Sequence, residues 1–294
     1  MTLTVLSGRD RSEDLGEGVF LHVFTRSDDA RLSAFFKAYD AAFILTDEKE
    51  DLDGFKACLD LNTGAAYARL SGLYGPYREL VLLLTEGADG RVLGAANFIA
   101  FAGDGTDPSI SLSYIFVDAA ERKRGHFSRL MALVKAEAKA SFDWPGAAPE
   151  PLIFIEMNDP VNMAPEDYAL DSQHAGLDQV DRLKIWERRG AQIVGMPYRQ
   201  PPLSDEQTAE SELLLGVLGA GSDTLDACRL ARHMRRFFGV TVLKGADPAG
   251  SPVAATQLSR LDEACVRGEF VPLTGFETIL AEAARVRRDR AAPA

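Results

Sequence analysis

The stretch SISLSYIFVDAAERKRGHFSRLMALVKAEAK, which runs from Ser109 to Lys139, predicts a strand, a tight turn and an amphipathic helix. It begins with an apolar run from Ile110 to Val117 that ends at Asp118. A basic turn with one glycine follows at residues 121–126, and apolar residues then recur at helical spacing. The residues of this helical stripe are Phe127, Leu130, Met131, Val134 and Ala138.

The turn between that strand and that helix has the composition of an anion site. The first turn of a helix leaves backbone N–H groups without intrahelical partners, and the helix dipole favours negative charge there. Gly125 permits close approach to the backbone, while Arg122, Lys123 and Arg124 supply opposite charge. The sequence therefore predicts a phosphate site, and the alternative is an ordinary crossover whose basic turn is solvated.

Composition excludes several classes of protein. The chain of 294 residues has a net charge of −12, which argues against general binding to nucleic acid or to an anionic membrane. It has no apolar run long enough to span a membrane and no signal pattern at its start, so we expect a cytoplasmic protein. Cys58, Cys228 and Cys265 lie far apart without metal spacing, which predicts reduced thiols and no metal site.

The order of predicted elements gives the fold class and the domains. Residues 1–18 read as a loose lead-in, and residues 158–177 as a long polar loop. A hairpin, a third strand, the helix above and further strands and helices follow two N-terminal helices, which predicts an α/β (α+β) fold. Its mixed, mostly antiparallel sheet has about six to seven strands, with helices on both faces. This domain spans residues 19–221, and residues 222–294 form a helical extension.

The turn is similar to the Q/R-x-x-G-x-G/A motif of the GNAT superfamily, the acyl-CoA-dependent N-acyltransferases. Arg122 fills its first position and Gly125 the central one, but Phe127 replaces the small residue of the last position. The segment 182–191 resembles the late helix of the family, and YRQPPL at 198–203 is similar to a strand end of uncharacterised bacterial members. The chain thus resembles such a member with a C-terminal helical extension, over about residues 19–219.

The resemblance implies acetyl-CoA as co-substrate, bound where strands 111–117 and 152–157 separate. It implies that the backbones of two strand residues pair with the pantetheine arm and that the turn holds the pyrophosphate. Asn158 either hydrogen-bonds in the cleft or, as part of Asn-Asp-Pro, simply begins a turn. His126, at the start of the helix, either contacts the phosphates or the adenosine end, or is an exposed first-turn residue. The implied cofactor-binding residues are Phe116, Val117, Arg122, Lys123, Arg124, Gly125, His126, Phe127, Ser128 and Asn158.

Two residues are candidates for catalysis. Glu156 is the expected general base, because it lies among apolar neighbours on a strand that borders the implied cleft, and the alternative is a charge that faces solvent. Many family members place a tyrosine on the late helix as the general acid, where this chain has Trp186. Tyr198 is then the candidate acid, with other tyrosines or unassisted departure of the thiolate as alternatives. A backbone N–H near Val117 is expected to stabilise the oxyanion.

The resulting hypothesis is an N-acetyltransferase that moves an acetyl group from acetyl-CoA to a primary amine of a small molecule or peptide by direct attack. A catalytically silent acyl-CoA-binding or regulatory module is the alternative, and Trp186 favours it. The extension is expected to pack on the acceptor groove or to form a homodimer. No nucleic acid, membrane or metal is expected as a partner.

Overall fold

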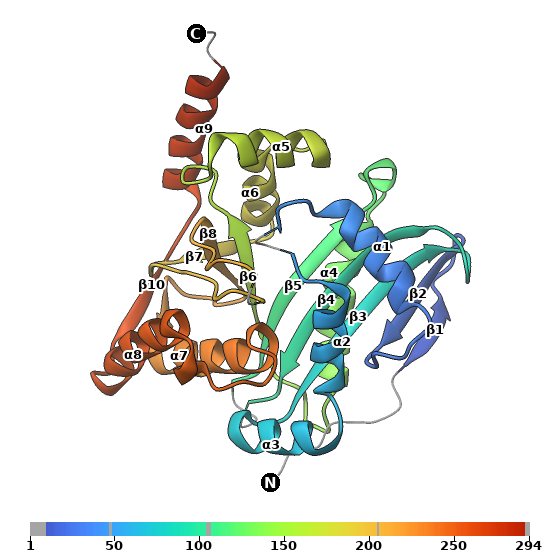
Figure 1. Ribbon diagram of the computed structural model, residues 1–294, viewed down its shortest axis with the longest axis horizontal. Coiled ribbons are helices and arrows are strands. Elements are labelled where there is room, and N and C mark those ends of the chain that lie inside the picture. Colours follow the sequence, from blue (N-terminus) through green and yellow to red (C-terminus); the bar gives the residue numbers. More distant parts are fainter. Residues whose placement is uncertain (1–9, 47–48, 104–106, 205, 292–294) are drawn as a thin grey trace. The chain divides into compact units, whose positions relative to one another are not determined.

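The computed structural model describes residues 10–46, 49–103, 107–204 and 206–291. It divides into two compact units. The first consists of residues 1–42, 50–151 and 235–248, and the second of residues 43–49, 152–234 and 249–294. Each unit combines helices with antiparallel strands (Figure 1).

The first unit contains the strand, turn and helix predicted from the sequence. Its strands lie in the order β1-β2-β3-β4-β5, and each neighbouring pair is antiparallel. The strands are β1 (Arg11–Asp14), β2 (Val19–Phe24), β3 (Tyr77–Glu86), β4 (Val92–Phe101) and β5 (Ser109–Val117). The helices are α1 (Leu32–Ala42), α2 (Leu52–Asp60), α3 (Gly64–Tyr74) and α4 (His126–Ala140), with a 3-10 turn η2 (Ala119–Glu121) and a π-helical segment η3 (Phe238–Val242).

Helices cover both faces of the sheet in the first unit, as predicted. Strands β3 and β4 are buried at almost every position, which requires cover on both sides. Helices α1 and α2 lie over one face and α4 over the other (Figure 1). On the first face the ring of Tyr114 lies 4.7 Å from that of Tyr39 and 5.7 Å from that of Phe55, measured between centroids. On α4 the predicted stripe is buried at Leu130, Met131, Val134 and Ala138.

A bulge at Ser113 divides β5 into two halves. Tyr114 pairs with Asn97 and Leu112 pairs with Phe98, so Ser113 is an additional residue on this strand. Residues 109–112 are buried, whereas every residue from Ser113 to Val117 is partly exposed. The half of β5 that leads into the basic turn is therefore the accessible one.

The second unit carries the Glu156 strand. Its strands lie in the order β6-β8-β7-β10-β9, again with antiparallel neighbours. They are β6 (Leu152–Asn158), β7 (Ala191–Val194), β8 (Leu213–Leu218), β9 (Thr224–Asp226) and β10 (Phe270–Thr274). The helices are α5 (Pro165–Ala175), α6 (Gln179–Arg188), α7 (Ala227–Phe237), α8 (Pro252–Val266) and α9 (Glu277–Ala291), with a short turn η4 (Pro248–Gly250) at the boundary of the units.

The structure corrects several details of the predicted organisation. The described residues form ten strands, not six to seven, because the short strands β1, β9 and β10 lack a clear apolar alternation. β1 lies in the predicted lead-in, whose residues 1–9 are outside the described part of the chain. The predicted loop 158–177 contains helix α5, whose sequence PEDYALDSQHA is mostly polar. The predicted extension is divided, since residues 235–248 belong to the first unit.

The prediction of three reduced cysteines is wrong. Cys228 and Cys265 form a disulfide with their Cα atoms 4.5 Å apart, while Cys58 is free and buried. Cys228 follows β9 and Cys265 lies near the end of α8, just before β10. The pairing of Phe270 with Asp226 brings these two chain segments together. Sequence spacing gave no sign of this because 37 positions separate the two cysteines.

No helix in the described residues is long and apolar enough to cross a membrane.

A two-point charged contact connects the N-terminal strand β1 to helix α4. The guanidinium of Arg11 on β1 donates to both carboxylate oxygens of Glu137 on α4, at 2.9 and 2.7 Å. Because Glu137 is buried, this two-point contact supplies the partner that its charge requires.

A buried carboxyl group on β3 makes stability depend on pH. Burial raises the pKa of Glu79 to about 7, against a lowering effect from Asn97, whose Nδ2 donates to Oε1 at 2.5 Å. The other oxygen, Oε2, is buried and has no hydrogen-bond partner among the described residues. A carboxyl whose pKa is raised on folding contributes its full stability below its ordinary pKa of 4.5, and that contribution is lost as the pH rises through about 7.

We therefore expect Glu79→Gln, the neutral isostere, to stabilise the protein at pH 8 and to have little effect at pH 4.5. The gain at pH 8 is on the order of 3 kcal/mol, since each pKa unit corresponds to about 1.4 kcal/mol. Urea denaturation at the two pH values measures it. Glu13→Gln, on the exposed strand β1, is the control and should show no such difference. Equal destabilisation by Glu79→Gln at both pH values would contradict the prediction.

Candidate functional site

The basic turn has the backbone geometry of an open helix N-terminus. Lys123 has φ +66 and Gly125 has φ +85, so the chain reverses through two left-handed residues before α4 begins. Gly125 is the N-cap of α4, and no side-chain hydrogen bond caps the helix within the described part of the chain. A Cβ added at Gly125 would meet nothing within 4 Å. The space beside the Cα of Gly125 is thus open.

Glu121 contacts two arginines and one histidine at this turn. Its buried carboxylate lies 2.6 Å from Arg91 Nη2, 3.2 Å from Arg124 Nη1 and 3.8 Å from His126 Nε2. The hydrogen bond from Arg91 lowers the pKa of Glu121, so the carboxylate is charged. Arg124, predicted as a phosphate ligand, is therefore shared with Glu121. Sequence reasoning missed this pairing because Arg91 comes from the end of a distant hairpin.

The other predicted residues of the turn differ in exposure. Lys123 and Ser128 are exposed, Arg122 and Phe127 are partly buried, and His126 is buried. The Nδ1 atom of His126 has no hydrogen-bond partner in the described residues. His126 is therefore not the exposed first-turn residue of the alternative hypothesis.

At the end of β5, successive residues direct their backbone N–H and C=O groups alternately toward β4 and away from it. The N–H of Asp118 donates to the carbonyl of Leu93 on β4, at 3.0 Å. Hydrogen bonding alternates along an antiparallel pair, so Phe116 also directs its backbone groups to β4. Val117 directs its N–H and C=O away from β4. Of the two residues predicted to pair with a pantetheine arm, Val117 has the suitable orientation.

In the second unit the structure brings Glu156 and Tyr198 together. The hydroxyl of Tyr198 donates a hydrogen bond to Oε1 of Glu156, across 42 positions of sequence. Tyr198 is buried, whereas Glu156 retains a partly exposed surface on β6. Burial of the carboxyl group raises the pKa of Glu156 to about 7; the bond from Tyr198 opposes this rise and the charge of Glu210 adds to it. Burial and the charge of Glu156 hold the pKa of Tyr198 well above its ordinary value.

Asn158 lies two residues beyond Glu156 on the same strand, and therefore on the same face of the sheet. Its Nδ2 atom is buried and has no hydrogen-bond partner among the described residues. A buried amide donor without a partner is uncommon in proteins, because its desolvation is not compensated. Glu156 and Asn158 thus present one carboxyl group and one unused donor side by side.

The other two tyrosines that are candidates for the general acid contact different residues. Tyr168 donates to Asp178 at 3.0 Å, next to the N-terminus of α6. Tyr114 packs edge-on against Tyr39 in the first unit. Trp186, at the position of the family's tyrosine, lies partly exposed on α6.

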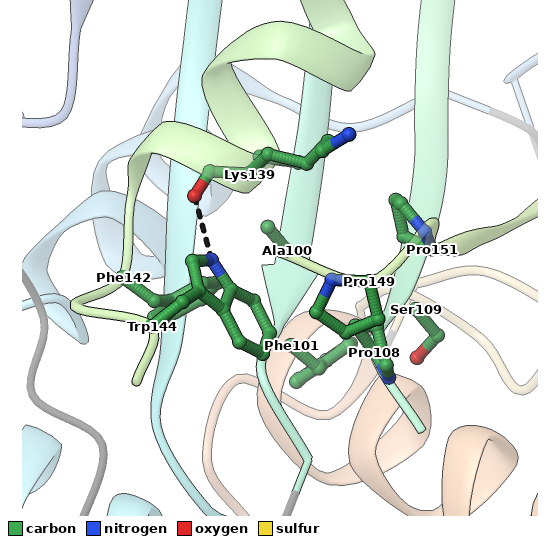
Figure 2. A pocket seen from close by; sticks show the side chains of 10 residues that line it. Ala100, Phe101, Pro108, Ser109, Lys139, Phe142, Trp144, Pro149 and Pro151 are labelled. Atoms are coloured by element: carbon green, nitrogen blue, oxygen red, sulfur yellow. Dashed lines mark hydrogen bonds between the residues drawn. The ribbon is translucent and has the colours of Figure 1, made fainter. Parts of the chain in front are cut away.

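A small apolar pocket lies at the other end of α4 and is separate from the turn (Figure 2). Trp144 donates its indole N–H to the carbonyl of Lys139 at 2.7 Å and forms one wall. The lining residues are Ala100, Phe101, Pro108, Ser109, Ala138, Lys139, Phe142, Trp144, Pro149 and Pro151. Because α4 is about 20 Å long, this pocket cannot serve a phosphate at Gly125. The described residues contain no cluster of three potential metal ligands.

No protein-family model matches the chain, and no curated protein matches it. Solved structures of GNAT acetyltransferases are similar to it. A Bacteroides thetaiotaomicron protein assigned to the GNAT family is 14% identical, with a TM-score of 0.45, over 77% of this chain and 99% of the other. Arabidopsis thaliana Naa50 in complex with the bisubstrate analogue CoA-Ac-MVNAL is 10% identical, with a TM-score of 0.39, over 68% and 98%. The Escherichia coli ribosomal-protein-S18-alanine N-acetyltransferase is 14% identical, with a TM-score of 0.38, over 69% and 98%.

Proposed function

We propose that the chain is an acyl-CoA-dependent N-acyltransferase that moves an acetyl group from acetyl-CoA to a primary amine of a small molecule or peptide. The observation that carries this proposal is the hydrogen-bonded pair of Glu156 and Tyr198. A carboxyl group with a pKa of about 7 is matched to proton transfer at neutral pH. A module that only binds acyl-CoA has no need of such a group.

The residues of the turn fit the donor substrate. An uncapped helix N-terminus, open space in front of Gly125 and surplus positive charge suit a diphosphate. The outward N–H and C=O of Val117 suit an amide of the pantetheine arm, and the unused Nδ2 of Asn158 suits a carbonyl oxygen. The contact with Asn158 would give a hydrogen-bond partner to a buried donor whose desolvation is otherwise uncompensated.

The transfer then follows from the chemistry of the pair. The amine nitrogen attacks the thioester carbonyl carbon while Glu156 accepts an N–H proton. A backbone N–H stabilises the oxyanion, and the C–S bond breaks to release the thiolate. The thiolate leaves without a protein acid, because a thiol has a pKa near 8.5 and is a good leaving group. Glu156 returns its proton to solvent.

In this mechanism Tyr198 is a positioning residue. Its hydroxyl proton is engaged with Glu156, and its raised pKa makes it a weak acid. We expect Tyr198→Phe to move the pH profile of kcat/KM to higher pH, since the lost hydrogen bond lowers the pKa of Glu156 in the wild type. Activity should fall at pH 7 and recover by pH 9. Loss of activity at every pH would instead identify Tyr198 as the general acid of the sequence-based prediction.

The proposal is tested with the purified chain, acetyl-CoA and a panel of amines. The panel contains α-amino peptides, lysine, aminoglycosides and polyamines, and release of free thiol is measured with and without each amine. Amine-dependent thiol release that is matched by acetylated product supports an enzyme. Tight binding of acetyl-CoA without transfer to any amine would favour the silent acyl-CoA-binding module, which the tryptophan at position 186 also favours.

A further inference from the structure

An exposed serine and a buried histidine contact each other on strands β1 and β2, at the edge of the sheet in the first unit (Figure 1). Ser12 on β1 is the register partner of His22 on β2, so both side chains stand on one face of the sheet. The Oγ atom of Ser12 lies 2.8 Å from Nδ1 of His22. Ser12 is exposed, whereas His22 is 3% exposed. A serine hydroxyl within hydrogen-bond reach of an imidazole has the geometry of a nucleophile beside its base.

Thr85 on β3 determines which nitrogen of His22 carries the proton. Its register partner is Phe20, two residues before His22 on β2, so Thr85 shares the face of His22. The hydroxyl of Thr85 donates to the carbonyl of Gly87 at 2.6 Å, and its oxygen lies 2.9 Å from Nε2 of His22. Because the hydroxyl proton of Thr85 is already used, Nε2 is the donor in this contact. In the neutral imidazole Nδ1 then has a lone pair, which accepts the hydroxyl proton of Ser12.

The surroundings of His22 favour this neutral form. Burial, and then the charge of Arg31, lower the pKa of His22, and the charges of Asp29 and Asp89 and a hydrogen bond to the backbone of Ala88 oppose this lowering. A histidine whose pKa lies below its ordinary value of 6.5 is neutral at pH 7. Only the neutral imidazole can accept a proton, so the base beside Ser12 is in its active form at neutral pH.

Arg31 places positive charge at the serine oxygen. Its Nη1 atom donates to Oγ of Ser12 at 2.7 Å and lies 3.2 Å from Nδ1 of His22. Asp29 accepts from Nε of Arg31 at 2.9 Å, which fixes the position of the guanidinium. The guanidinium therefore stabilises negative charge on Oγ as the proton leaves. Ser12 thus has a base on one side and a cation on the other, and a third group orients the base, as in the constellation of an activated nucleophile.

We propose that Ser12, His22 and Thr85 form a separate acyl-transfer centre, in which Ser12 attacks small activated carboxylic esters. The Oγ atom of Ser12 forms a bond to the carbonyl carbon while its proton passes to Nδ1 of His22. The bond between that carbon and the leaving oxygen breaks, and the leaving oxygen takes the proton from Nδ1. Water then attacks the acyl-serine with His22 again as base, which yields the carboxylic acid and restores the hydroxyl of Ser12.

The exposure of the site indicates this class of substrate. Ser12 and its neighbours Glu13 and Asp14 are exposed, so an ester reaches the hydroxyl directly. An open surface supplies little binding energy with which to activate a poor leaving group. The reactivity must then come from the ester itself, which favours a phenyl ester over an alkyl ester. The centre needs no acetyl-CoA and is independent of the proposed function.

The test uses the purified chain and para-nitrophenyl acetate, without acetyl-CoA. We expect a burst of one para-nitrophenol for each chain, followed by slower turnover, and peptide mass spectrometry should locate one acetyl group on Ser12. Ser12→Ala should lose the burst. Ser33→Ala, at an exposed serine on α1, is the matched control and should retain it. A burst that persists in Ser12→Ala, or a wild type without a burst, would overturn the proposal.

Thr85→Val tests the role of Thr85 as a positioning residue. Valine keeps the shape of the side chain but removes the acceptor of the Nε2 proton, so the tautomer with its proton on Nδ1 gains population. We expect the burst to become about tenfold slower, the equivalent of one neutral hydrogen bond, with its amplitude unchanged. Nitrogen NMR of the wild-type His22 ring should show the proton on Nε2. A proton on Nδ1 in the wild type would refute the proposal, whether or not the variant folds.

Discussion

Glu156→Gln should lower kcat/KM for acetyl transfer by about 10²- to 10⁴-fold, the usual contribution of a positioned general base. Glutamine has the same shape and can accept the hydrogen bond of Tyr198 but cannot take the proton of the attacking amine. Binding of coenzyme A should be unchanged, because glutamine keeps the shape of the side chain and its hydrogen bond from Tyr198. Steady-state kinetics with the best amine of the panel, together with a titration of coenzyme A, measures both effects.

The pH dependence gives this prediction its specific signature. The base form of Glu156 is the carboxylate, so wild-type activity should rise with pH through about 7 and then level off. In Glu156→Gln this rise should disappear. Glu187→Gln, an exposed position on α6, should keep both the rate and the rise. A Glu156→Gln protein with full activity and an unchanged profile would assign the base to another group.

The strand, turn and helix around Gly125 could be predicted because their signals are local. The apolar period changes from that of a strand to that of a helix within a few residues, and the basic glycine turn marks the junction. Strand β1 carries no such signal, since RSED is polar and, among the described strands, pairs with β2 alone. Helix α5 was missed for a similar reason. Its eleven residues bury only Tyr168 and Asp171, which leaves no apolar stripe to recognise.

Sequence patterns identify single residues of the candidate site, but they do not identify the residues with which these make contact. Glu156 was selected as a carboxylate among apolar neighbours and Tyr198 by its sequence context, but their hydrogen bond spans 42 positions. Arg91 and Glu121 meet only after β4 and β5 pair. Contacts between distant segments depend on tertiary packing, and no local pattern encodes them.

Reduction of the disulfide between Cys228 and Cys265 should have the largest effect on stability. The bond closes a loop across a sequence separation of 37. Restriction of the unfolded chain by a loop of that size corresponds to about 4 kcal/mol. We expect a reducing agent to lower the free energy of unfolding of the oxidised protein by about this amount, and Cys228→Ser with Cys265→Ser to do the same without it. Urea denaturation with and without dithiothreitol measures the difference.

A count of reactive thiols tests for the disulfide without any measurement of the free energy of unfolding. The oxidised protein should expose one reactive thiol in denaturant, that of Cys58, and the reduced protein three. The double serine variant should be insensitive to dithiothreitol, because Cys58 alone remains and is buried in the folded state. Three thiols in protein purified without reductant would mean that the pairing of β9 with β10 holds the two sulfur atoms together without a bond. In that case the reductant should not change stability, and the sequence-based expectation of reduced cysteines would be restored.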